Sequence, residues 1–256
     1  MSDFSDEVAA NVEAAARNVP LNEAAQAFMR ASIDARYSYN FSWMGRPIIQ
    51  YPQDIVAMQE LIWKVKPDLI IETGIAHGGS LIFSASMLAL LDLSEAIEAG
   101  ETLDPARPKR RVVGVDIDIR EHNRRAIEAH PMAHRIEMIQ GSSIDPEVIK
   151  TVTAIADLHA RILVCLDSNH THDHVLSELK AYAHLTSLDS YCVVFDTVVE
   201  NLPEANFADR PWAVGNNPMT AVHEFLRLHP EFEIDNSVEN RLLLTVAPQG
   251  YLRRKA

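Results

Sequence analysis

Short, continuous apolar runs alternate with helical patterns through the middle of this chain. The apolar runs are rich in Ile, Val and Leu and cover residues 68–72, 111–115, 135–139, 161–166 and 191–195. The helical patterns between them cover residues 80–91, 121–129, 146–156 and 172–184. Continuously apolar strands are typical of a sheet covered by helices on both faces. The alternation of strand and helix predicts a parallel sheet with right-handed crossovers.

The two ends of the chain show other patterns. The first 36 residues predict two helices, with a boundary at residues 20–23 that ends one helix and caps the next. A Tyr- and Trp-rich loop at 37–51 and a helix at 52–64 lead into the first strand. After the fifth strand, a loop rich in Pro and Asn precedes a helix and a terminal β-hairpin. We expect that helix at 220–228 and the hairpin strands at 232–234 and 242–246.

Together these elements predict the domain organisation. We expect an N-terminal helical segment at 1–36 and a single α/β domain at 37–256. The domain is predicted to be doubly wound and Rossmann-like, with seven mostly parallel strands. The charged stretch at 94–110 is interpreted as an insertion between the first helix and the second strand.

Composition and charge narrow the range of partners. The formal net charge of −13 argues against a nucleic-acid partner, because phosphates would be repelled. The apolar runs are shorter than the about 20 residues that span a bilayer, and the N-terminus is acidic, unlike a signal peptide. Cys165 and Cys192 each lie in an apolar run, which predicts buried thiols. We therefore expect a cytoplasmic protein without a membrane or nucleic-acid partner.

The loop after the first strand has the composition of a ligand-binding turn. Gly74, Gly78, Gly79 and Ser80 follow Glu72 in the segment between strand and helix. Glycines let a ligand approach the backbone closely, and the helix N-terminus favours a negative group. The spacing differs from the G-x-G-x-x-G of dinucleotide sites, and the acid would repel a pyrophosphate. The loop favours a ligand with an amino-acid ammonium, and a plain turn without ligand is the alternative.

Polar residues also follow the second and third strands. Asp116 ends the second strand, where a carboxylate can accept both hydrogen bonds of a ribose diol. After the third strand, Ser142 and Ser143 could bind an adenine edge. The alternative for Ser143 and Asp145 is a helix cap, and the two interpretations have equal weight.

The fourth and fifth strands end in carboxylates. Asp167 and Asp196 should converge beside the cofactor, because ligands gather at the C-terminal ends of parallel strands. With Thr197 or Asn201 as a neutral oxygen, they suit an octahedral Mg²⁺ that would orient a substrate oxygen. His170 lies three residues beyond Asp167 and could act as a general base. A His/Asp cluster could instead hold Fe(II) for oxygenase chemistry.

Several of these motifs resemble the cephalosporin hydroxylase family, a group of class I S-adenosylmethionine-dependent methyltransferases that includes sugar and natural-product O-methyltransferases. The resemblance extends from about residue 42 to 252. Its most specific segments are residues 72–74 with 78–80, 115–120, 141–143, 166–170 and 217–220.

The resemblance implies a methyl-donor site and a catalytic site. The donor site would comprise Glu72, Gly74, Gly78, Gly79, Ser80, Asp116, Ser142, Ser143 and Asp167. By similarity to this family and to catechol O-methyltransferase, Asp167 and Asp196 would bind a metal and His170 would be the catalytic base. One departure weakens the metal site: some family members carry two adjacent acids at the end of the fifth strand, where this chain has Phe195-Asp196-Thr197.

The resulting functional prediction is an S-adenosylmethionine-dependent O-methyltransferase, assisted by Mg²⁺, for a hydroxyl of a small molecule such as a sugar or natural product. The acceptor pocket is expected under the segments 37–43 and 206–217. The alternatives are an Fe(II)-dependent hydroxylase and a donor-binding accessory protein. The two N-terminal helices are expected to offer an interface for a homo-oligomer.

Overall fold

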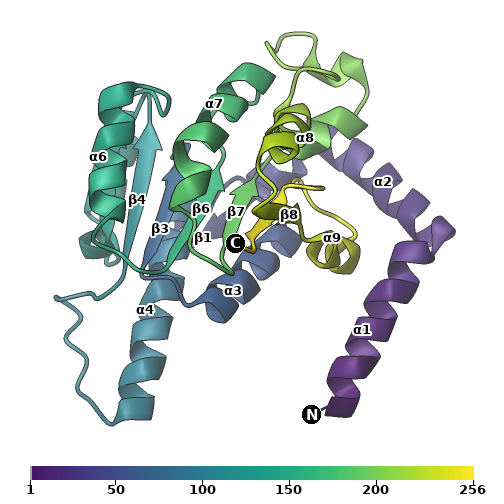
Figure 1. The fold of residues 1–256 in the computed structure, drawn as a ribbon. Helices are drawn as coiled ribbons and strands as arrows, with labels where there is room; N and C mark the ends of the chain where they lie inside the picture. Colours follow the sequence, from purple (N-terminus) through teal and green to yellow (C-terminus); the bar gives the residue numbers. More distant parts are fainter. Residues whose placement is uncertain (1) are drawn as a thin grey trace.

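The computed structural model describes residues 2–256. Its centre is a seven-stranded sheet, which lies between the helices in Figure 1. The strand order is β5-β4-β3-β6-β7-β9-β8. The strands are β3 (Leu69–Thr73), β4 (Arg111–Asp116), β5 (Ile136–Gln140), β6 (Ile162–Leu166), β7 (Tyr191–Val194), β8 (Phe232–Ile234) and β9 (Tyr251–Arg254). The first five pair in parallel, and β9 is antiparallel to both of its neighbours. The predicted doubly wound, mostly parallel sheet of a class I methyltransferase is confirmed.

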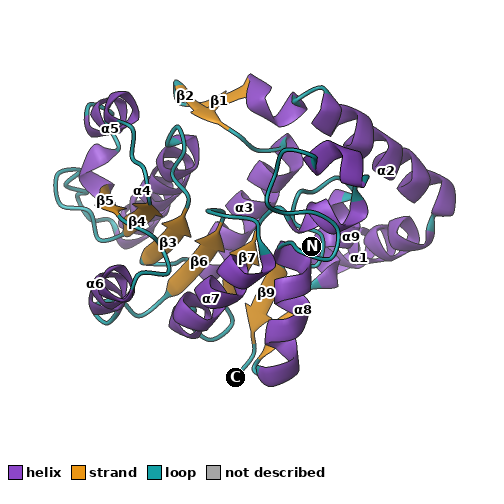
Figure 2. Cartoon of the chain, turned by 90° about the horizontal axis from the view of Figure 1, so that it is seen from above, coloured by secondary structure: helices purple, strands orange, loops and turns teal. Residues whose placement is uncertain are grey.

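Helices cover both faces of this sheet, as Figure 2 shows from above. One layer contains α3 (Pro52–Val65), α4 (Gly79–Ala99) and α5 (Glu121–Glu128), and the other contains α6 (Pro146–Ala156), α7 (His172–Tyr182) and α8 (Pro218–Leu228). Along β3, Ile70 belongs to one buried cluster and Leu69 and Ile71 to the other. Side chains of a strand alternate between the faces, so apolar residues at every position fill two cores.

The N-terminal segment forms the two predicted helices, α1 (Ser2–Arg17) and α2 (Val19–Asp34). The boundary lies at Asn18 and not at the predicted 20–23: the Asn18 side chain accepts a hydrogen bond from the Leu21 backbone, and Pro20 lies inside the first turn of α2. Pro is tolerated there because the first helical N–H groups have no partner within the helix. The end of α2 is part of the main fold, since the buried Ser32 hydroxyl lies 2.7 Å from the Tyr51 hydroxyl.

Short elements connect the main ones. The predicted loop at 37–51 contains a hairpin of β1 (Phe41–Trp43) and β2 (Arg46–Ile48). Its turn is formed by Met44 and Gly45, both at positive φ, as two-residue hairpin turns require. The 3₁₀ segments are Tyr37–Asn40, Ala133–Arg135, Ala183–Leu185, Thr197–Asn201 and Glu204–Phe207.

The predicted strand at 242–246 is wrong. Asp235 caps a short helix, α9 (Asn236–Leu242), and the seventh strand is β9 instead. Thr245 and Val246 donate hydrogen bonds to the buried carboxylate of Asp54 rather than to a strand. The carboxylate of Asp54 therefore holds this apolar segment in the interior without strand pairing. The apolar run alone does not distinguish this arrangement from a strand.

The first crossover helix is longer than predicted. Helix α4 continues to Ala99, and Gly100 in a left-handed conformation ends it, so only the residues beyond Gly100 form the expected insertion loop. Among the described residues, α4 is the one helix long and apolar enough to cross a membrane by length and composition, and half of that stretch is buried inside the fold. The buried thiols Cys165 and Cys192 lie on the neighbouring strands β6 and β7 and are free, as predicted.

Candidate active site

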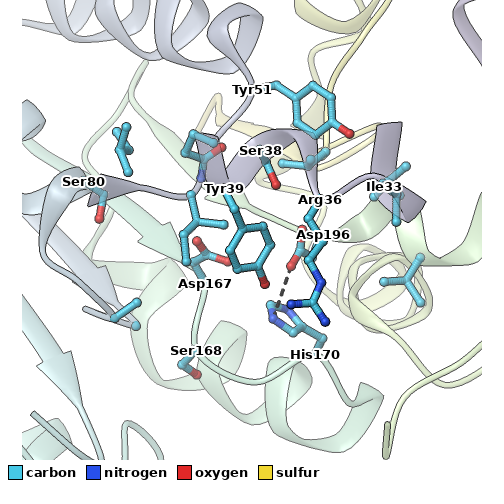
Figure 3. Close-up of a pocket in the computed structure, with 18 of the residues that line it drawn as sticks. Ile33, Arg36, Ser38, Tyr39, Tyr51, Ser80, Asp167, Ser168, His170 and Asp196 are labelled. Carbon is cyan, nitrogen blue, oxygen red and sulfur yellow. Dashed lines mark ion pairs between the residues drawn. The ribbon is translucent and has the colours of Figure 1, made fainter. Parts of the chain in front are cut away.

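A cavity of about 550 Å³ opens at the C-terminal edge of the parallel strands. Its floor is formed by the residues that follow β3, β6 and β7, among them Gly74, Asp167 and Asp196. Figure 3 shows Asp167, His170 and Asp196 facing the same space, with Tyr39 and Arg36 beside them. A cavity of this volume at a sheet's carboxyl edge is typical of a small-molecule site.

The predicted convergence of the two acidic strand ends is confirmed. One ligand atom each from Asp167, His170 and Asp196 lies within 4.8 Å of the others. His170 Nε2 is 3.2 Å from Asp196 Oδ2, and the imidazole packs edge-on against Trp212 at 4.7 Å between ring centres. Burial raises the pKa of Asp167 well above its usual range, and the nearby charge of Asp196 raises it further.

This donor set fits a divalent cation. Two carboxylates held together in a partly buried site repel each other, and a bound cation removes that cost. Carboxylate oxygens are the ligands that Mg²⁺ prefers. One histidine with two carboxylates is the reverse of the two-histidine, one-carboxylate triad that holds Fe(II) in oxygenases.

Thr197 is not brought to this cluster. Its side chain is fully buried, and its hydroxyl donates to the Pro248 carbonyl at 2.6 Å. The left-handed backbone of Asp196 (φ 56°) turns the chain between the two side chains. The sequence predicted Thr197 as a ligand because of its position after Asp196, and the turn separates the two.

The glycine loop lies against the acidic cluster. Gly74, Gly79 and Ser80 line the cavity. Gly74 has φ +90°, and a Cβ there would lie 2.0 Å from the Asp167 carbonyl oxygen. A Cβ on Gly79 would lie 2.1 Å from the Pro47 carbonyl oxygen. Gly78 (φ +80°) packs against Ile127, so it permits the turn into α4 without lining the cavity.

Glu72 lies one layer deeper. It is buried at the end of β3 and accepts a hydrogen bond from Ser80. Burial raises the pKa of Glu72 to about 7, while the Ser80 hydrogen bond lowers it. Glu72, Ser80 and Asp167 border a second cavity of about 30 Å³ beneath the main one. The acid is thus next to the glycine loop, as predicted, with a neutral and an ionised form both accessible near pH 7.

The carboxylate of Asp116 accepts hydrogen bonds from the backbone of the glycine loop and of its own turn. Its Oδ2 accepts hydrogen bonds from the backbone N–H groups of Ile75 (2.8 Å) and Ala76 (3.2 Å), and its Oδ1 accepts one from Asp118 (2.9 Å). The carboxylate therefore fixes the glycine loop to the end of β4. Its assignment to a donor ribose stays a prediction.

The two serines after β5 differ in their surroundings. The cap of α6 is Asp145, whose side chain accepts from the N–H groups of Glu147 and Val148. Ser143 does not cap; its hydroxyl lies 3.0 Å from His174 Nε2 and 3.5 Å from the Ser168 hydroxyl. Ser142 and Ser143 do not line the main cavity, and their contact with a donor adenine stays a prediction.

The upper wall of the cavity comes from segments far apart in the sequence. Both segments expected over the acceptor contribute, with Ser38 and Tyr39 from one and Asn206, Arg210 and Trp212 from the other. Ile33 and Arg36 from the end of the N-terminal helical pair were not predicted. No local pattern distinguishes them, because they face the cavity only through the packing of α2 on the main fold.

Comparisons with known proteins identify the family of this chain. Residues 35–255 match the Rhamnosyl O-methyltransferase/CmcI family. A rhamnosyl O-methyltransferase of Mycobacterium bovis (strain BCG / Pasteur 1173P2) is 26% identical over 247 residues, which cover 90% of this chain and 89% of that protein. The corresponding enzyme of Mycobacterium leprae (strain TN) is 26% identical over 216 residues, covering 84% and 83%.

Solved structures of CmcI share the fold. Its Mg–SAM form is 19% identical, with a TM-score of 0.54 over 85% of this chain and 78% of that one. Its SAH form is 20% identical, with a TM-score of 0.55 over 84% and 83%. The chain therefore belongs to the Rhamnosyl O-methyltransferase/CmcI family, whose members are S-adenosylmethionine-dependent O-methyltransferases.

Proposed function

We propose that this enzyme transfers the methyl group of S-adenosylmethionine to a hydroxyl of a small-molecule acceptor such as a sugar, and that it uses a divalent cation, Mg²⁺, to do so. The observation that carries the proposal is the cluster of Asp167, His170 and Asp196 in the same cavity as the glycine loop. The Mg–SAM form of CmcI and the names of the mycobacterial relatives support it.

The proposed roles follow from position. Gly74, Gly79 and Ser80 would contact the donor, and Glu72 beneath them would balance its ammonium group. Asp167 and Asp196 would hold the cation, which when bound orients the acceptor oxygen and lowers its pKa. The acceptor would enter beneath Tyr39 and Trp212.

His170 would receive the proton. Its Nε2 faces Asp196, so the imidazole is oriented and Nδ1 keeps the free lone pair. As the acceptor oxygen bonds to the methyl carbon, the sulfur–methyl bond breaks and the hydroxyl proton passes to His170. The products are the methyl ether and S-adenosylhomocysteine. Trp212 limits rotation of the imidazole through its edge contact.

The deciding experiment is calorimetric titration of S-adenosylhomocysteine with and without Mg²⁺, on the wild type and Asp167→Asn. We expect binding to the wild type and a separate Mg²⁺ heat that the variant loses. Asp145→Asn, a change in the α6 cap, is the matched control. Absence of S-adenosylhomocysteine binding at millimolar concentration would contradict the proposal, and donor binding without any metal effect would remove the cation from it.

A further inference from the structure

Two arginines at the mouth of the main cavity have no ionic partner. Arg36 follows the end of α2, and Arg210 lies in the loop after the 3₁₀ segment Glu204–Phe207. Both side chains are exposed and line the cavity. Among the described residues neither forms an ion pair with a carboxylate. Two unpaired guanidinium groups facing one cavity form a ready-made anion site, because arginine binds phosphate and carboxylate through paired N–H donors.

Contacts inside the cavity fix where Arg210 lies relative to the reaction. Its guanidinium carbon is 5.3 Å from the centre of the Trp212 ring, a cation–π contact. The same indole packs edge-on against His170 at 4.7 Å. One aromatic side chain thus separates the arginine from the catalytic histidine.

Arg36 belongs to a neighbouring segment of the same wall, since Asp34 at the end of α2 accepts a hydrogen bond from Asn206. Figure 3 shows its side chain extending toward His170 and Asp196. Its backbone is left-handed (φ 52°), a conformation that glycine or asparagine would adopt at lower cost, so the turn itself does not require arginine.

The charge balance of the cavity supports an anionic ligand. The chain as a whole has a net charge of −13 and repels anions. The charged residues that line this cavity are the two arginines and the two aspartates of the cluster, together with two histidines. A divalent cation on Asp167 and Asp196 would neutralise the aspartates. The cavity would then present the positive charge of both arginines to the acceptor.

We propose that the acceptor carries an anionic group, a phosphate or a carboxylate, in addition to the hydroxyl that is methylated, and that Arg36 and Arg210 bind this group. This inference rests on the proposed function, since it names the substrate class of the same site. The hydroxyl would lie at Asp167, His170 and Asp196, with the anionic group at the mouth.

The test compares matched charged and neutral sugars. Rhamnose 1-phosphate and methyl rhamnoside form one pair, and methyl glucuronoside and methyl glucoside form the other. Each is titrated by calorimetry into protein saturated with S-adenosylhomocysteine and Mg²⁺, and into the free protein. We expect a charged sugar to bind at least about tenfold more tightly than its neutral partner, as hydrogen bonds to charged groups allow. A preference in the first pair alone identifies phosphate, and one in the second alone identifies carboxylate.

Variants assign the preference to the arginines. Arg36→Ala and Arg210→Ala should each reduce it about tenfold, with S-adenosylhomocysteine affinity unchanged within about twofold. The controls are Arg30→Ala on α2 and Arg107→Ala in the distant insertion loop, which remove the same charge away from the cavity. They should leave the preference for the charged sugar unchanged.

Equal affinity within both pairs, or no binding of any of the sugars, would overturn the inference. An unchanged preference in the arginine variants would also overturn it. So would a loss of S-adenosylhomocysteine affinity in these variants, because it would assign the arginines to the donor carboxylate. If the wild type binds no S-adenosylhomocysteine, the proposed function fails, and the titrations of free protein still decide the arginine sites.

Discussion

Two carboxylates, Asp54 and Glu72, line the small cavity beneath the active cavity, and each is held in a different way. Asp54 is fully buried and accepts hydrogen bonds from Thr245, Val246 and Tyr251. Burial raises its pKa to about 6 despite these donors. Glu72 has one donor, Ser80, and a pKa of about 7. At the residue scale, the site keeps acids where ionisation is costly, which is expected where a cationic ligand compensates.

The substitution Glu72→Gln tests the free-energy cost of ionising Glu72 in its buried position. The folded pKa of about 7 exceeds the ordinary value of 4.5, so native Glu72 retains its proton between these pH values while the unfolded chain releases it. The free energy of unfolding of the wild type should therefore fall by up to about 3 kcal/mol, relative to that of the variant, as the pH rises from 4.5 to 7. Denaturant unfolding of both proteins at pH 5 and pH 8 measures this difference. A constant difference between the two pH values would show that Glu72 is ionised throughout.

His170→Ala tests the base. We expect methyl transfer to fall about 10²–10⁴-fold, the range for loss of a general base. Because His170 does not belong to the glycine loop, affinity for S-adenosylhomocysteine should remain unchanged. The exposed His134, in the 3₁₀ segment Ala133–Arg135, provides the control substitution. An unreduced transfer rate in His170→Ala would exclude it as the base.

At the scale of elements, the site depends on close backbone approaches between neighbours. The β2 strand crosses the start of α4 at Gly79, and the loop after β3 touches the loop after β6 at Gly74. These contacts hold the glycine loop against Asp167. They explain why glycines occur at these two positions.

Gly79→Ala should separate β2 from α4. Its Cβ would lie 2.1 Å from the Pro47 carbonyl oxygen, a backbone atom that cannot rotate away. We expect a destabilisation of about 1–3 kcal/mol, typical of overpacking, and weaker donor binding. Gly100→Ala at the end of α4 meets no atom within 4 Å and should retain donor affinity. Thermal unfolding and calorimetry measure both effects, and equal donor affinity in the two variants would contradict this role of Gly79.

At the scale of the whole molecule, the two N-terminal helices have different relations to the rest. The end of helix α2 lies at the wall of the cavity, which is lined by Ile33 of the helix and by Arg36 just after it. The described side chains of helix α1 do not line that wall, and they include exposed apolar ones such as Phe4, which is 70% exposed. The predicted boundary at 36/37 thus falls within the cavity wall.

Two truncations test whether α1 and α2 differ in their contribution to donor binding and to stability. Removal of residues 1–17 should leave S-adenosylhomocysteine affinity within about twofold, because α1 packs on α2 and α9 outside the site. Removal of residues 1–36 should also expose Tyr51, which is 1% exposed in the fold, and should lower the melting temperature. Identical melting temperatures for the two truncations would show that α2 does not stabilise the main fold.

Light scattering tests the predicted homo-oligomer, which requires a mass above 28.6 kDa. The measurement compares the wild type with the protein that lacks residues 1–17.

The sequence alone determined the five parallel strands of the sheet, the helices between them and the strand ends that carry Asp167 and Asp196. These features are local: continuous apolar runs define strands buried on both faces, and parallel strands place their carboxyl ends on one edge. For the same reason, the meeting of His170 with the two aspartates was predictable from its position after β6.

Only the tertiary structure decided how these residues are used. The turn at Asp196 directs Thr197 to Pro248, the carboxylate of Asp54 anchors a segment that reads as a strand, and the packing of α2 brings Arg36 to the cavity. The first two outcomes depend on partners about 50 and 190 residues away along the chain. Sequence patterns report a residue's neighbours along the chain, whereas the direction of a side chain is fixed by contacts that form when distant segments pack.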